Sequence, residues 1–77
     1  MNTCFVCAYG WIVIGKEEGR TADAVTLTDA SVVRRWSNGK GIGGIAKEKN
    51  KDEYTLDAIG DAVIRLGKVL FEIPCEW

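Results

Sequence analysis

Short runs of β-branched and aromatic residues, interrupted by glycine or by charged residues, most constrain the fold of this 77-residue chain. Such runs favour β-strands, because branched and aromatic side chains pack well on a pleated surface. The first two runs cover residues 3–9 and 11–16, with Gly10 between them. They predict two strands or one long bent strand. Residues 17–24 contain a glycine and few apolar residues, which predicts a turn.

The middle of the chain continues the same pattern. Residues 25–28 alternate apolar and polar side chains, which predicts a strand with one buried face. Residues 29–31 predict a bend before the segment 32–36 (VVRRW), and the Asn-Gly pair at 38–39 predicts a tight turn. Residues 45–50 have room for one or two turns of helix.

The last third of the chain predicts three further strands. Residues 54–58 alternate, and residues 62–66 and 69–73 are apolar runs joined at Gly67. Pro74 ends the last of them, because proline is tolerated only at strand ends and sheet edges.

A helix over residues 56–70 is the alternative for this region, because its apolar residues recur at spacings of three and four. They are Leu56, Ile59, Val63, Leu66 and Leu70. Gly60 and Gly67 would each cost a helix interior about 1 kcal/mol, which favours the strands.

Together these elements predict a mainly β fold, a small bent antiparallel sheet or open barrel with one short helix. The helical alternative predicts an α+β fold, in which a β-meander packs against a C-terminal helix. With one proline and 47% hydrophobic residues the composition is that of a globular chain. No repeat or linker divides it, so we expect a single domain over residues 1–77.

The apolar segment from Cys4 to Gly15 is too short to span a bilayer. No basic residue precedes it and no small-residue cleavage pattern follows, so it does not match a signal peptide. We therefore expect a cytoplasmic protein with no membrane partner, whose cysteines are thiols.

Cys4 and Cys7 form a C-x-x-C pair, but residues three apart on a strand point to opposite faces. Only Cys75 could add a third sulfur ligand, so we expect three buried thiols and no metal site. The chain has no histidine, which removes the commonest general base. We interpret Asp57 and Asp61 as a solvated acidic edge, and we expect no enzyme and no cofactor.

Charge is unevenly distributed along the chain. Residues 34–51 hold six basic side chains and one acidic one, and residues 52–61 hold four acidic ones, although the net charge is −1. A local basic segment in a slightly acidic protein favours a small anionic ligand over long nucleic acid.

The basic segment combines the groups that bind a nucleotide. Glycines let backbone N–H groups surround a phosphate, arginine and lysine supply cations, and tryptophan supplies a stacking face. The candidate ligand-binding residues are Arg34, Arg35, Trp36, Asn38, Lys40, Gly41, Gly43 and Gly44. The alternative is a glycine-rich turn with solvated charges and a core tryptophan. On a strand, Arg34 shares a face with Trp36 while Arg35 points to the other face.

Three segments carry a resemblance to a known family: residues 25–30 (VTLTDA), residues 34–36 (RRW) and residues 72–75 (EIPC). Together with the glycine turn and the short Ile-Ala segment between them, they resemble an uncharacterised family of small, β-rich phage and prophage proteins. The resemblance begins at Val25 and covers about two thirds of the chain. The chain departs from the family in having one tryptophan where two are frequent, and in a lysine-rich insertion over 47–51.

The resemblance implies a phage origin, and small phage proteins without catalytic groups often inhibit host factors. Our leading hypothesis is a homo-oligomer that sequesters a phosphate-bearing small molecule, such as a nucleotide immune signal, as an anti-defence sponge. One alternative is a protein-binding inhibitor of a host defence factor, anchored by Trp11 and Trp77. Another is single-stranded nucleic-acid binding, with Trp36 as the stacking platform.

Overall fold

The computed structural model describes residues 2–36, 41–47 and 54–77, which form one antiparallel sheet and one short α-helix. The strands are β1 (Asn2–Cys7), β2 (Ile12–Arg20), β3 (Ala24–Trp36), β4 (Tyr54–Arg65) and β5 (Val69–Pro74), the helix is α1 (Gly41–Lys47), and two 3-10 turns are η1 (Ala8–Gly10) and η2 (Leu66–Lys68). The strand order is β4-β3-β2-β1-β5, and the sheet does not close. The predicted mainly β class, with a bent sheet and one short helix, is confirmed.

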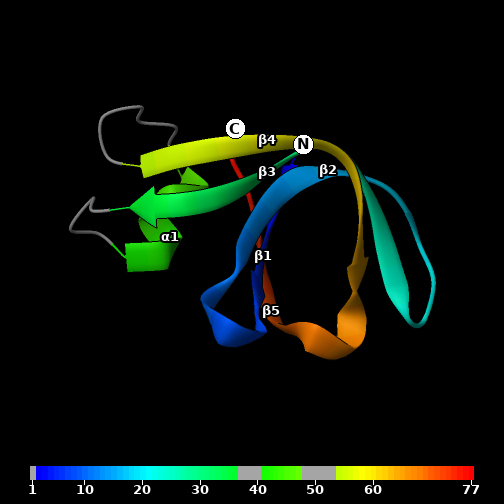
Figure 1. Cartoon of the computed structure of the whole chain (residues 1–77). Helices are drawn as coiled ribbons and strands as arrows, with labels where there is room; N and C mark the ends of the chain where they lie inside the picture. Colours follow the sequence, from blue (N-terminus) through cyan, green and yellow to red (C-terminus); the bar gives the residue numbers. More distant parts are fainter. Residues whose placement is uncertain (1, 37–40, 48–53) are drawn as a thin grey trace.

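The sheet curls strongly, with β3 and β4 running side by side over the top and turning down together (Figure 1). The bend has a local cause, because three neighbouring strands are irregular at the same level. The register of β2 shifts beside Gly15, Asp29 of β3 has φ 49°, and Gly60 of β4 has φ 73° and pairs with Ala30. Bulges of this kind bend a strand and increase its twist. We call Gly15, Asp29, Ala30 and Gly60 the bend line.

The sheet buries side chains on both faces. The helix-side core contains Cys4, Ile12, Ile14, Val33, Ile45, Ala46, Tyr54 and Cys75. The inner core, inside the curl, contains Phe5, Cys7, Val13, Val25, Leu27 and Ala30. Successive residues of a strand face opposite sides, so Cys4 enters one core and Phe5 the other. This explains why β1 and the start of β2 are apolar without alternation.

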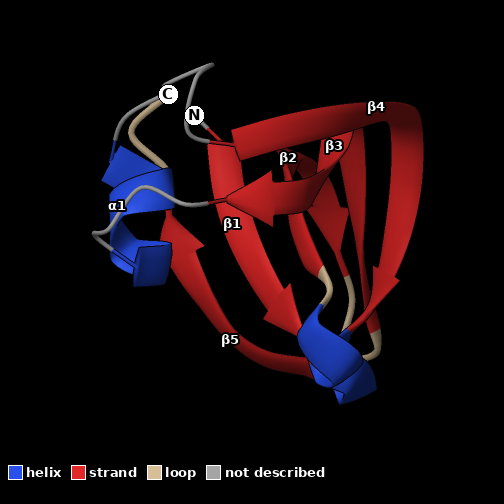
Figure 2. Cartoon of the chain, turned by 60° about the vertical axis from the view of Figure 1, so that its left-hand side comes forward, coloured by secondary structure: helices blue, strands red, loops and turns tan. Residues whose placement is uncertain are grey.

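Helix α1 is held against the sheet by the C-terminal residues (Figure 2). The Trp77 indole N–H donates to the Ile45 carbonyl at 2.7 Å, and the backbone N–H of Glu76 donates to the Ala46 carbonyl at 2.7 Å. The Trp77 ring stacks on Tyr54 with 6.1 Å between centroids. A helix of seven residues is marginal alone, so this packing stabilises it. It begins at Gly41 rather than at residue 45, while residues 48–50 lie outside the described part of the chain.

The helix considered for residues 56–70 is wrong, since the structure has β4, η2 and β5 there. Leu56 packs on the helix-side core, whereas Ile59 and Val63 are exposed. Their spacing therefore does not mark one buried face. The positive φ of Gly60 is also incompatible with a right-handed helix.

The turn predicted over residues 17–24 is too long, because β2 continues to Arg20. The second half of β2 pairs with β3, with Arg20 opposite Val25. The Arg20 guanidinium also contacts the carboxylates of Glu17 at 2.7 Å and Glu72 at 2.8 Å. Pairing and charge compensation together explain how this polar segment forms a strand. None of the helices in the described segments is long and apolar enough to cross a membrane.

Candidate functional site

The described residues of the predicted basic and glycine-rich site lie on two different elements, β3 and α1. Gly41, Gly43 and Gly44 belong to α1, where Gly44 is buried and Gly43 is exposed, so they do not form a loop. Asn38 and Lys40 lie outside the described residues, and for Trp36 only the backbone is described. The described part of this segment therefore offers a short packed helix rather than a glycine loop around an anion.

Arg34 and Arg35 lie near the end of β3, and both are exposed. Val33 pairs with Leu56 and Arg35 with Thr55, so Arg34 is the extra residue of a bulge. The prediction that the two arginines point to opposite faces assumes regular alternation along the strand. The bulge interrupts that alternation. Arg34 forms an ion pair with Asp57 of β4, with 2.9 Å between Nε and Oδ2.

The turn between β1 and β2 exposes two aromatic side chains. Tyr9 is 93% exposed and Trp11 is 59% exposed, on either side of Gly10. Tyr9 has φ 62°, which is uncommon and strained for a bulky residue. A backbone hydrogen bond from the Cys7 N–H to the Trp11 carbonyl, 2.7 Å long, closes the turn. Strain of this kind persists only where the surroundings enforce it, and it clusters at functional sites.

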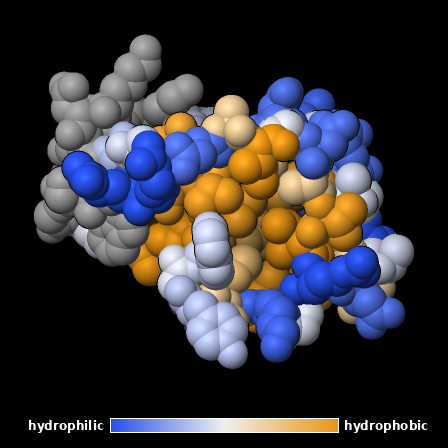
Figure 3. Space-filling model, viewed as in Figure 1, coloured by the Kyte–Doolittle hydropathy of each residue, from blue (hydrophilic) through white to orange (hydrophobic). Residues whose placement is uncertain are grey.

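A hollow of about 350 Å³ opens between this turn and the end of β4 with η2. We call it the lysine hollow. The face that it opens on has an apolar area at its centre, rimmed by hydrophilic residues (Figure 3). Apolar patches with a polar rim are typical of binding sites.

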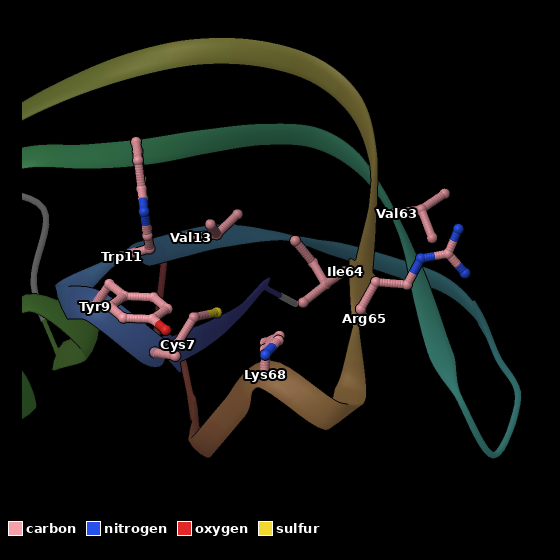
Figure 4. Close-up of a pocket in the computed structure, with 9 residues that line it drawn as sticks. Cys7, Tyr9, Trp11, Val13, Val63, Ile64, Arg65 and Lys68 are labelled. Carbon is pink, nitrogen blue, oxygen red and sulfur yellow. The ribbon is translucent and has the colours of Figure 1, made fainter.

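The side chains of the lysine hollow come from three elements (Figure 4). Tyr9 and Trp11 stand on one side and Ile64 of β4 faces them from the other, with Val13 above. The Lys68 amine and the Cys7 sulfur lie between these walls. The Arg65 guanidinium points away from the centre, although Arg65 is also part of the lining. The lining thus combines aromatic and aliphatic surface with two cations and no carboxylate.

A second hollow, of about 370 Å³, adjoins the same turn. We call it the arginine hollow, because Arg34 and Asp57 line it together with Val32 and Val33. Tyr9 and Trp11 line both hollows. We call the turn of Tyr9, Gly10 and Trp11 the aromatic turn. Arg34 is therefore the one predicted site residue that the described structure brings to the aromatic turn.

The cysteines are free and buried, as predicted. Cys4 belongs to the helix-side core and Cys7 to the inner core, so the C-x-x-C pair is split between the two faces. Burial, with smaller contributions from the neighbouring Cys75 and Cys7, raises the pKa of Cys4 to about 12. Burial also raises the pKa of Cys7, so its thiol in the lysine hollow is uncharged at neutral pH. Among the described residues, no cluster of three cysteine or carboxylate side chains could hold a metal ion.

Comparison of the chain with known proteins gives no match to any family model, curated protein or solved structure. The chemistry of the two hollows is therefore the basis for proposing a function.

Proposed function

We propose that the protein binds and sequesters a small phosphate-bearing molecule that carries a flat ring, such as a nucleotide, without catalysing a reaction. The observation that carries this proposal is the lysine hollow, where two exposed aromatic side chains and an ammonium group surround apolar surface. Its volume of about 350 Å³ is at the lower end of the range for ligand sites. That size suits one ring system with its phosphate.

Each part of such a ligand has a counterpart in the lysine hollow. Stacking of a base on an aromatic side chain is worth about 1–3 kcal/mol, and Trp11 offers its indole for it. Val13 and Ile64 supply apolar surface from which the ring displaces water. Lys68 supplies the charge for the phosphate, and no carboxylate in the lining opposes it.

The absence of catalysis is part of the proposal. The Cys7 thiol is held in its uncharged form by burial, which makes it a poor nucleophile. The chain has no histidine to act as a general base. The lysine hollow therefore contains groups that hold a ligand rather than groups that transform it.

The resemblance to small phage proteins supports the finer proposal that the ligand is a nucleotide immune signal, sequestered in the host cytoplasm. Self-association is also proposed, because β4 and β5 are edge strands and β5 exposes Leu70 and Phe71. Light scattering of the purified protein tests this. A mass of several chains is expected, and a mass of 8.5 kDa would contradict it.

Thermal unfolding against a panel of linear and cyclic nucleotides and ADP-ribose derivatives tests the binding proposal. A ligand at about 100 times its dissociation constant adds about 2.7 kcal/mol of stability. For a domain of this size that raises the Tm by about 10 °C or more. Lys68→Met and Trp11→Leu should lose most of this shift. Lys16→Met removes an exposed lysine outside both hollows and serves as the matched control.

Two outcomes would contradict the proposal. If no member of the panel shifts the Tm, the aromatic turn is better explained as an anchor for a host protein, with Trp11 rather than the packed Trp77 in contact. If Arg35→Gln abolishes binding while Lys68→Met leaves it unchanged, the ligand binds at the basic segment instead.

A further inference from the structure

We infer that the arginine hollow is a second subsite of the same ligand site, and that it takes a planar polar ring with hydrogen-bond donors and acceptors on one edge. The preferred ligand would then carry two rings joined through phosphate, and guanine is the base whose edge fits. This inference rests on the function proposed for the lysine hollow.

The two hollows lie against the same turn. Both are lined by Tyr9 and Trp11, and they have similar volumes, about 350 and 370 Å³. A ligand with a ring in each hollow would therefore cross the aromatic turn. That arrangement explains why Tyr9 is exposed and has a strained backbone although it belongs to neither core.

The two hollows differ in charge. Lys68 and Arg65 make the lysine hollow positive, whereas Arg34 and Asp57 compensate one another in the arginine hollow. A phosphate gains little from a compensated pair, but a neutral polar ring can bond to both partners. The two subsites thus differ in the part of a nucleotide that each accepts.

The ion pair between Arg34 and Asp57 is accessible to a ligand. The Arg34 side chain is 65% exposed and that of Asp57 is 45% exposed, and the contact between them joins Nε to Oδ2. A guanidinium has five N–H donors and a carboxylate has about four acceptor positions. Arginine donates to O6 of guanine, and a carboxylate accepts from the ring N–H and amino groups beside O6 on the same edge of the base. Guanine offers both kinds of group, while adenine lacks the O6 acceptor and the N1 donor.

Two paired strands position the ion pair of Arg34 and Asp57. Arg34 is the extra residue of the β3 bulge, a feature that redirects a side chain and is frequent beside active sites. Asp57 stands on β4 opposite Val32, in the adjacent paired strand. The two charged groups therefore come from neighbouring strands of one sheet rather than from loops.

Isothermal titration of the native protein with GMP, with the linear dinucleotide 5′-pGpG and with 5′-pApA tests the inference. Joining two binding groups raises affinity by about 10²–10⁴-fold when both subsites can be filled, so pGpG should bind about 100-fold more tightly than GMP. The pApA dinucleotide should bind about 10-fold more weakly than pGpG. Asp57→Asn should weaken pGpG by about 10-fold and change GMP by less than twofold. Asp61→Asn, on β4 outside both hollows, is the matched control.

The outcomes separate the two proposals. If neither GMP nor a dinucleotide binds, the second subsite is refuted, and the function proposed for the lysine hollow fails only if the wider nucleotide panel also leaves the Tm unchanged. If GMP binds but pGpG binds no more tightly, or if Asp57→Asn weakens both equally, the second subsite is refuted and the first stands. Circular dichroism of each variant shows that a loss of binding is not a loss of folding.

Discussion

Replacing Gly15 with alanine tests the origin of the bend, because the backbone of β3 and the side chains on it lie close to this glycine of β2. A Cβ atom there would stand 3.1 Å from the Cβ atoms of Ala30 and Leu27, and 3.2 Å from the Cα of Ala30. These atoms are fixed to the β3 backbone, so no side-chain rotation relieves the contact. The two strands must separate by a few tenths of an ångström.

The cost of Gly15→Ala follows from this crowding. Overpacking a buried site costs about 1–3 kcal/mol, and Leu27 and Ala30 are 0% and 1% exposed. Replacing glycine also lowers the conformational entropy of the unfolded chain, which stabilises the folded state by about 0.4–1 kcal/mol. We therefore expect a net loss of about 1–2 kcal/mol. For a domain of this length that lowers the Tm by about 4–16 °C.

Thermal and urea unfolding followed by circular dichroism measure this loss. Gly19→Ala is the matched control, because it lies on the same strand and an added Cβ meets nothing within 4 Å. It should leave stability unchanged or raise it by about 0.5 kcal/mol. A Gly15→Ala protein as stable as the native one, or equal losses in both variants, would refute the account of the bend line.

Four further predictions concern the core and the surface. At pH 8 the three thiols should react slowly with a water-soluble alkylating reagent and quickly in denaturant, because all are buried; rapid reaction of the folded protein would contradict this. Because the pKa of Cys4 is raised, its thiol keeps its proton in the folded state, whereas the unfolded thiol ionises near 9.0. The free energy of unfolding should therefore fall as pH rises from 9 towards 12, by on the order of 1 kcal/mol per pH unit. Urea titrations of Cys4→Ala should show a smaller dependence on pH. Trp77→Phe leaves the Ile45 carbonyl without its indole donor and should cost about 1–2 kcal/mol in thermal unfolding. Arg20→Gln should lower the Tm only slightly, and the difference should vanish at about 1 M salt, because the ion pairs are exposed.

The sequence predicts those parts of the fold that depend on local pattern. The strands, the single short helix and the opposite faces of Cys4 and Cys7 follow from residue type and alternation. The extension of β2 to Arg20 does not, because it depends on pairing with β3 and on Glu72, 52 residues away. The start of α1 at Gly41 depends on contacts with the C-terminal residues.

The candidate site is harder to predict from sequence for the same reason. Tyr9 and Lys68 are distant in the chain and line one hollow because β1 pairs with β5, with Cys7 opposite Val69. A Tyr-Gly pair between two apolar runs indicates a turn, but no local signal says that the tyrosine is left exposed. Arg34 was identified from its charge, and its neighbour Asp57 is found only once β3 and β4 are paired.

The burial of β1 and early β2 on both faces has a consequence for the chain before it folds. Residues 4–15 contain no charged side chain and are rich in β-formers, and in the native sheet this surface is covered apart from the turn over residues 8–11. In an unfolded molecule the same segment is free to pair with copies of itself, and only Lys16, Glu17 and Glu18 border it with charge. Refolding should therefore compete with aggregation, and its yield should fall as protein concentration rises. The segment that contributes to both cores is therefore also the segment that favours aggregation when folding is slow.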